Sequence, residues 1–164
     1  MGWVSLAMLC LVGTCFGAMP VDPSRFRRRR SFVLVAAAGP LMNLLLALLT
    51  LTSLAAWNLS MTSGVPDSDT GENLQAFLWT FGYCNVALFF FNLIPIPPLD
   101  GSTVLAGFSR GYARIVESVR NPAIFLIALM LVFALLSSQD HGLYAVSARI
   151  SDEYVMTIYA LAGR

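Results

Sequence analysis

Uncharged apolar runs alternate with short polar segments along this chain. The clearest run covers residues 31–56 and is rich in Leu and Ala, and a second covers residues 74–94. A helix needs about 20 mostly apolar residues to cross a bilayer, so both runs are long enough. Two further apolar runs, residues 3–18 and 122–136, are shorter. The pattern predicts an all-α membrane protein with three to four transmembrane helices.

Prolines interrupt the pattern between the apolar runs at residues 3–18 and 31–56. Pro20 and Pro23 disfavour a helix, so a short extended segment is predicted near residues 19–26. The run at residues 3–18 has the length of a secretory signal peptide, but no basic residue precedes it, as one does in most signals. A short membrane helix is therefore the favoured interpretation, and a signal peptide is the alternative.

The polar C-terminal segment is predicted to behave differently from the apolar runs. Residues 137–164 mix charged and apolar positions, which favours an interfacial C-terminal tail rather than another span. No internal repeat or linker divides the 164 residues, so a single membrane-embedded domain is expected over residues 1–164.

Composition excludes several classes of protein. The chain is 57% hydrophobic and 12% charged, with a mean hydropathy of +0.73, whereas soluble domains carry about 25% charged residues. These values exclude a disordered chain, a nucleic-acid-binding protein and an ordinary soluble enzyme. The lipid bilayer is the partner that they indicate.

Charge predicts how the chain is oriented. Five arginines lie between Arg25 and Arg30, while residues 58–73 carry acidic groups and no basic one. Positively charged loops beside membrane spans stay in the cytoplasm. A multi-pass integral membrane protein is therefore expected, with the arginines and Asp100 on the cytoplasmic side.

Two short motifs break the apolar pattern in a way that a passive span does not need. In the first, Gly39-Pro40-Leu41-Met42-Asn43, the glycine allows another segment to approach closely and the asparagine places an amide in hydrocarbon. The alternative interpretation is a helix-packing seam, with Asn43 bonding across helices.

The second motif follows the apolar run at residues 74–94 directly. Asn92 is followed by three prolines and then by Asp100-Gly101, before a helix expected over residues 102–119. An ionisable residue at such a place is a candidate functional residue. The alternative is that Asp100 caps the helix that follows it, a common role for aspartate.

Together the two motifs resemble those of a known family. Residues 37–43, AAGPLMN, and 91–101, FNLIPIPPLDG, are similar to the paired GPxxN and NxxPxPxLDG motifs of the site-2 proteases. These are zinc metalloproteases that cut membrane-anchored protein substrates within the membrane. The resemblance covers roughly residues 3–136 and is closest to the short family members. It implies that Asp100 is a zinc ligand and that Asn43 and Asn92 lie at the substrate-binding groove.

One feature of the family is missing from this sequence. Two zinc-binding histidines and the general-base glutamate of the family come from an HExxH helix, and the chain has no HExxH and a single histidine, His141. We therefore expect part of a membrane-embedded zinc metalloendopeptidase that is inactive on its own. Retention of Asn43, Asn92 and Asp100 favours this hypothesis. The alternative is a non-catalytic pseudoprotease that acts as a membrane binding scaffold.

Overall fold

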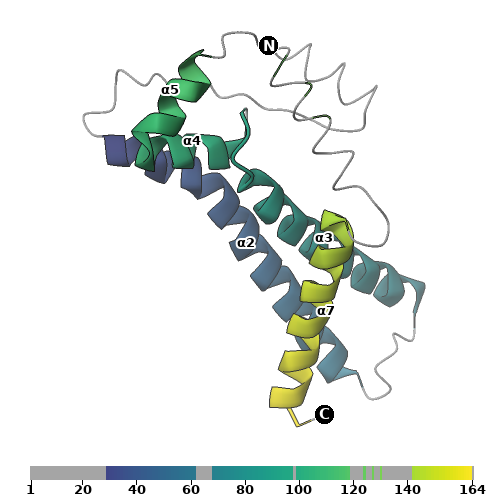
Figure 1. Cartoon of the computed structure of the whole chain (residues 1–164). Helices are drawn as coiled ribbons and strands as arrows, with labels where there is room; N and C mark the ends of the chain where they lie inside the picture. The colour runs from purple at the N-terminus through teal and green to yellow at the C-terminus, as the bar shows by residue number, and fades with distance from the viewer. Residues whose placement is uncertain are drawn as a thin grey trace.

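Helices form the part of the protein that the structure, a computed structural model, describes (Figure 1). Described are residues 29–61, 68–97, 99–118 and 142–163, together with residues 124, 127 and 130. The helices are α2 (Arg29–Ser60), α3 (Asp69–Asn92), α4 (Asp100–Phe108), α5 (Arg110–Ser118) and α7 (Leu143–Leu161). No strand occurs in these ranges, so the all-α prediction is confirmed for them.

Within the described residues, two helices are long and apolar enough to cross a membrane. They are Val33–Ser60 within α2 and Asp69–Asn92, which is α3. Only 17% and 22% of their most apolar stretches is buried inside the protein, whereas the core helix of a soluble protein is mostly buried. Large apolar side chains therefore face outward along both helices, as membrane spans require; examples are Leu34, Leu41, Leu45, Leu49, Phe77 and Leu88.

The described part thus holds two candidate spans, where three to four were predicted for the whole chain. The predicted run at residues 3–18 and the extended segment at residues 19–26 lie outside the described residues. So does the run at residues 122–136, apart from Ile124, Ile127 and Met130, which are helical and exposed.

α2 and α3 pack against each other along an apolar seam. A Cβ atom on Gly82 of α3 would lie 2.6 Å from Cδ2 of Leu51 on α2, so the missing side chain lets the two helices approach closely. Around this contact the core consists of Ala47, Leu51, Leu54, Ala55, Val86 and Val155. α3 begins at Ser68, whose hydroxyl accepts a hydrogen bond from the Gly71 backbone N–H at 3.2 Å.

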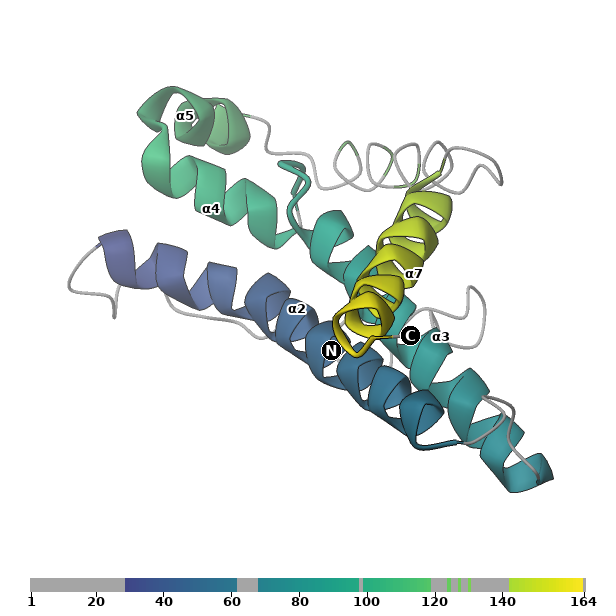
Figure 2. The ribbon, with the colours of Figure 1, turned by 90° about the horizontal axis from the view of Figure 1, so that it is seen from below.

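α7 packs against both spans and crosses them in Figure 2. Its most deeply buried residues are Ser147 and Ser151, which are fully buried and bond to carbonyl groups of their own helix. Three side-chain hydrogen bonds then fix α7: Thr52 to Tyr154 at 2.9 Å, Asn58 to Tyr159 at 2.8 Å and Trp79 to Asp152 at 3.1 Å. The predicted C-terminal segment therefore contains a helix packed against α2 and α3.

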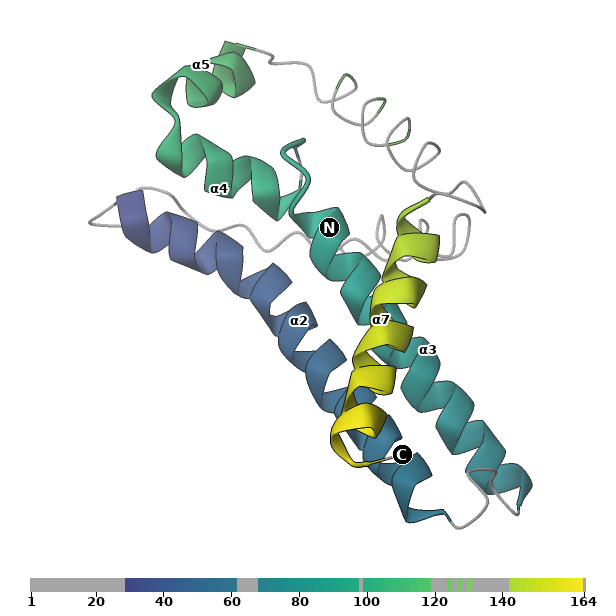
Figure 3. The same ribbon diagram turned by 60° about the horizontal axis from the view of Figure 1, so that its bottom comes forward.

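At its other end α2 contacts α4, as Figure 3 shows. A Cβ on Gly107 would collide with Val33, and one on Gly39 would collide with Asp100, so α4 runs antiparallel to this part of α2. The predicted helix over residues 102–119 is two helices, because Ser109 is extended (φ −112°, ψ 113°). Its N–H closes α4 and its hydroxyl accepts a hydrogen bond from the Tyr112 N–H at 3.2 Å, which starts α5.

Candidate active site where the two motifs meet

The segment between α3 and α4 is a chain of tight turns. Backbone hydrogen bonds join Ile94 N–H to the Phe91 carbonyl at 3.1 Å, Ile96 N–H to Ile94 at 2.8 Å and Leu99 N–H to Ile96 at 2.9 Å. Prolines in this segment lack the N–H that a continuing helix needs. The segment therefore turns back at once and brings the start of α4 to the end of α3.

Gly101 shows how close this return is. A Cβ atom at Gly101 would collide with the backbone carbonyl of Leu93 and would lie 2.8 Å from the carbonyl oxygen of Ile94. Glycine is needed here because two backbone segments touch. Leu99, two residues earlier, is also buried, at 5% exposed. The position of Asp100, between Leu99 and Gly101, is consequently fixed from both sides.

Asp100 lies against the first motif. Its Oδ2 atom would be 2.6 Å from a Cβ on Gly39, so only the missing side chain of Gly39 leaves room for the carboxylate. The sequence predicted that Gly39 allows close approach of another segment, and this is confirmed. The segment that approaches is the second motif itself. Two motifs separated by about 60 residues in the sequence thus meet at one contact.

The environment of Asp100 makes its charge costly. Burial raises the pKa of the Asp100 carboxyl above its ordinary value, because partial removal from water disfavours the ionised form. Asp100 is the first residue of α4, and the capping position belongs to Leu99, which forms no side-chain cap. The helix N-terminus still favours a negative charge nearby. The alternative in which Asp100 is the capping residue is wrong.

The two asparagines lie close to this contact along the chain. Asn43 is one helical turn beyond Gly39 on α2, so the two share a face of the helix. Asn92 is the last residue of α3 and precedes Leu93, whose backbone touches Gly101. Both asparagines are half-buried. Their predicted role in substrate binding stays a prediction.

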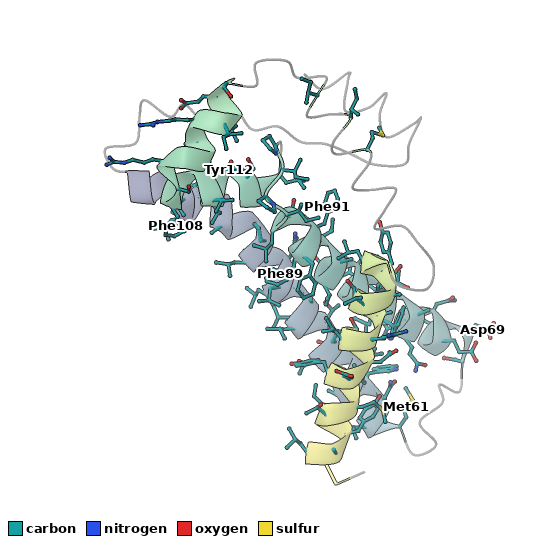
Figure 4. The ribbon with its side chains drawn as sticks, viewed as in Figure 1. Met61, Asp69, Phe89, Phe91, Phe108 and Tyr112 are labelled. Atoms are coloured by element: carbon teal, nitrogen blue, oxygen red, sulfur yellow. The ribbon has the colours of Figure 1, made fainter. Side chains whose placement is uncertain are left out.

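A further residue that the sequence did not single out reaches this segment from α5. The Tyr112 hydroxyl donates a hydrogen bond to the Pro95 carbonyl at 2.7 Å and bonds to the Ser102 hydroxyl at 3.1 Å. Figure 4 shows Tyr112 and Phe108 at this end of the molecule, and Asp69 and Met61 at the opposite end. The only signal in the sequence was a tyrosine opposite the arginines of an amphipathic stretch.

The described residues do not form a complete metal site. No three side chains of His, Cys, Asp or Glu among them gather closely enough to hold a metal ion. Catalytic zinc takes three protein ligands, and of these the sequence predicts one, Asp100; that role stays a prediction. His141 lies outside the part of the chain that the structure describes.

Comparison with known proteins locates a family resemblance in the same region. Residues 58–136 match the model of peptidase family M50, which is the site-2 protease family. The resemblance to the site-2 proteases is confirmed. The matched residues include Asn92, Asp100 and Tyr112, whereas Gly39 and Asn43 precede them.

A bacterial relative points the same way. The chain is 35% identical over 91 residues to YwhC of Bacillus subtilis (strain 168), which is classed by name as a candidate zinc metalloprotease. The aligned region spans 53% of this chain and 39% of the length of YwhC. No solved structure matches the chain significantly. The chain is thus similar to zinc metalloproteases, and its two candidate spans fit a membrane protein.

Proposed function

We propose that this chain is part of a membrane-embedded zinc metalloendopeptidase that cleaves membrane-anchored proteins. The observation that carries the proposal is the contact between Gly39 and the Asp100 carboxylate. Two helices approach at a glycine, and among the described residues the side chain that lies against this glycine is a carboxylate. A passive helix-packing seam has no need of an ionisable group there, and such groups at membrane depth mark functional sites.

In this proposal each residue has a stated task. Asp100 binds the metal ion through its carboxylate, and the turns from Leu93 to Leu99 hold it in place. Asn43 and Asn92 offer amide groups to the backbone of an extended substrate. A zinc ion bound nearby would supply Lewis-acid chemistry for peptide hydrolysis.

The orientation follows from the same arrangement. Arg110 and Arg114 are exposed on α5, at the end of the molecule where α2 begins and where Asp100 lies. The loop at the other end leads into Asp69 and Glu72 in the first turn of α3. By the positive-inside rule, Asp100 faces the cytoplasmic side of a multi-pass protein.

The remaining metal ligands and the general base belong, in this proposal, to polypeptide outside the present sequence. The 164 residues alone are then inactive. In-frame DNA upstream of the Met1 codon should encode an HExxH motif in an apolar stretch. A nearby stop codon without that motif would instead favour the alternative, a non-catalytic membrane binding scaffold.

The decisive experiment uses the product of the complete reading frame, purified in detergent. We expect stoichiometric zinc and cleavage of a membrane-anchored reporter, both of which Asp100→Ala should reduce to background. Asp69→Ala is the matched control, because Asp69 is exposed at the opposite end of the molecule. Unchanged zinc content and cleavage in Asp100→Ala would refute the proposal.

A further inference from the structure

We propose that Tyr112 is a positioning residue for Asp100. Its hydroxyl clamps the turn segment that precedes Asp100 to the first turn of α4, and so fixes where the carboxylate stands against Gly39. The functional part of this inference rests on the proposed role of Asp100 as a metal ligand.

The clamp is built from one hydroxyl and two partners on either side of Asp100. Pro95 lies five residues before Asp100 and Ser102 lies two residues after it. A phenol has a single proton. The Pro95 carbonyl oxygen, at 2.7 Å, and the Ser102 hydroxyl oxygen, at 3.1 Å, both accept from the Tyr112 hydroxyl and so share this one proton. One oxygen atom thus ties both ends of the segment together.

The hydrogen bond between Tyr112 and Ser102 contributes to stability because Ser102 is buried. Ser102 is 4% exposed, and within the described residues its hydroxyl bonds to Tyr112. A buried hydroxyl without a partner is destabilising, so loss of the Tyr112 oxygen would leave Ser102 to find another arrangement. Either the Ser102 side chain then rotates to another acceptor or the turn of α4 that carries Asp100 moves, and the exchange experiment below distinguishes the two.

α5 has the features of a brace for this segment. Tyr112 lies on the apolar face of a short helix whose other face carries the exposed Arg110, Arg114 and Glu117. Ser109 caps the helix through the Tyr112 N–H, which fixes the tyrosine backbone as well. The side chain therefore reaches the turn segment from a backbone position that is itself hydrogen-bonded.

The first test measures hydrogen exchange of the 164-residue chain in detergent micelles. In Tyr112→Phe, amides of residues 93–102 should exchange about tenfold faster, because local opening becomes easier, while α2, α3 and α7 stay unchanged. Tyr144→Phe, an exposed tyrosine on α7, is the matched control and should leave all segments unchanged. Unchanged exchange at residues 93–102, or faster exchange in every helix, would overturn the clamp.

A second variant separates the hydroxyl from a general effect on folding. Ser102→Ala removes the buried group that needs Tyr112, so exchange in the double variant should be less than the product of the two single effects. Fully multiplicative effects would contradict a shared hydrogen-bond network.

The functional arm uses the product of the complete reading frame. Tyr112→Phe should lower kcat and weaken zinc binding by about tenfold, as displaced supports of metal ligands do, with KM unchanged. A raised KM with unchanged kcat would overturn the positioning role. If Asp100→Ala itself retains cleavage, the proposed function fails, and the exchange result still decides whether the clamp exists.

Discussion

The two halves of α2 meet their neighbours in different ways. From Ala47 to Asn58, α2 packs against α3 and α7 through buried apolar side chains and two hydrogen bonds to tyrosines. From Val33 to Gly39, it packs against α4 through glycines, and the group placed at the contact is the Asp100 carboxylate. The part of α2 from Ala47 to Asn58 is thus packed by apolar side chains, whereas the part from Val33 to Gly39 lies against a carboxylate.

This difference has an energetic consequence. Apolar packing at the α3–α7 end stabilises the helices in one arrangement. At the α4 end, partial burial of a carboxylate opposes folding. The apolar packing of α2 against α3 and α7 therefore has to offset the free-energy cost of burying the Asp100 carboxylate at the α4 end.

The largest loss of stability is expected for Gly101→Ala. A Cβ here would collide with the Leu93 backbone, which cannot rotate away as a side chain could. Overpacking costs about 1–3 kcal/mol, and we expect the upper end because backbone must move. Thermal unfolding in detergent should show a clear loss of Tm.

Gly111→Ala is the control for this prediction. It lies in α5, and its Cβ would meet only the Ser109 hydroxyl oxygen, at 3.8 Å. Alanine is favoured over glycine in a helix by about 1 kcal/mol, so this variant should be neutral or stabilising. Equal Tm values for the two variants would show that the contact between Gly101 and Leu93 is not tight.

Gly82→Ala and Gly39→Ala sharpen the comparison, because both new Cβ atoms would lie 2.6 Å from a side-chain atom. At Gly82 the atom belongs to Leu51, which is 2% exposed and has no room to move, so we expect a loss of about 1–3 kcal/mol. At Gly39 it is the end of the Asp100 side chain, which can rotate. Gly39→Ala should therefore keep the Tm within a few degrees while reducing cleavage by the complete protein.

A reversed result would contradict this division of roles. If Gly39→Ala unfolds the protein as readily as Gly82→Ala does, the α2–α4 contact is a packing seam. Circular dichroism melts of both variants in the same detergent, with cleavage assayed beside them, distinguish the two cases.

Smaller effects are expected for the hydroxyl groups that fix α7. Tyr154→Phe removes the bond to Thr52, and Tyr159→Phe removes the bond to Asn58. Side-chain hydrogen bonds between membrane helices contribute about 0.6 kcal/mol on average, so each variant should lower the Tm slightly. A loss of α7 packing, seen as rapid hydrogen exchange over the whole helix, would mean that these bonds and not Ser147 and Ser151 hold α7.

Local physical rules explain what the sequence predicted well. The apolar runs over residues 31–56 and 74–94 exceed the length of a span, and the structure has helices at both. Gly39 and Asp100 were identified because glycine and aspartate are unusual in apolar surroundings. Their contact could not be derived, since it depends on how the proline-containing segment turns and how α4 crosses α2.

Tyr112 and the break at Ser109 were missed for a related reason. A single serine does not by itself predict the end of a helix. Ser109 separates α4 from α5 because its backbone is extended and because it forms hydrogen bonds to both helices. A tyrosine on an amphipathic helix looks like an ordinary apolar contact. The role of its hydroxyl shows only in the folded structure, where Pro95 and Ser102 lie within hydrogen-bond distance of it.

The smallest change in Tm is expected for Asp100→Asn, which tests the free-energy cost of burying the Asp100 carboxylate. Asp100→Asn keeps the size of the side chain and removes its charge, so the desolvation that raises the pKa of the carboxyl no longer opposes folding. In the metal-free 164-residue chain at neutral pH, the Tm should be unchanged or slightly higher, although the favourable charge at the start of α4 is also lost. The same substitution should abolish cleavage by the complete protein. A marked fall in Tm would instead mean that Asp100 stabilises the fold, and its presence would then need no catalytic explanation.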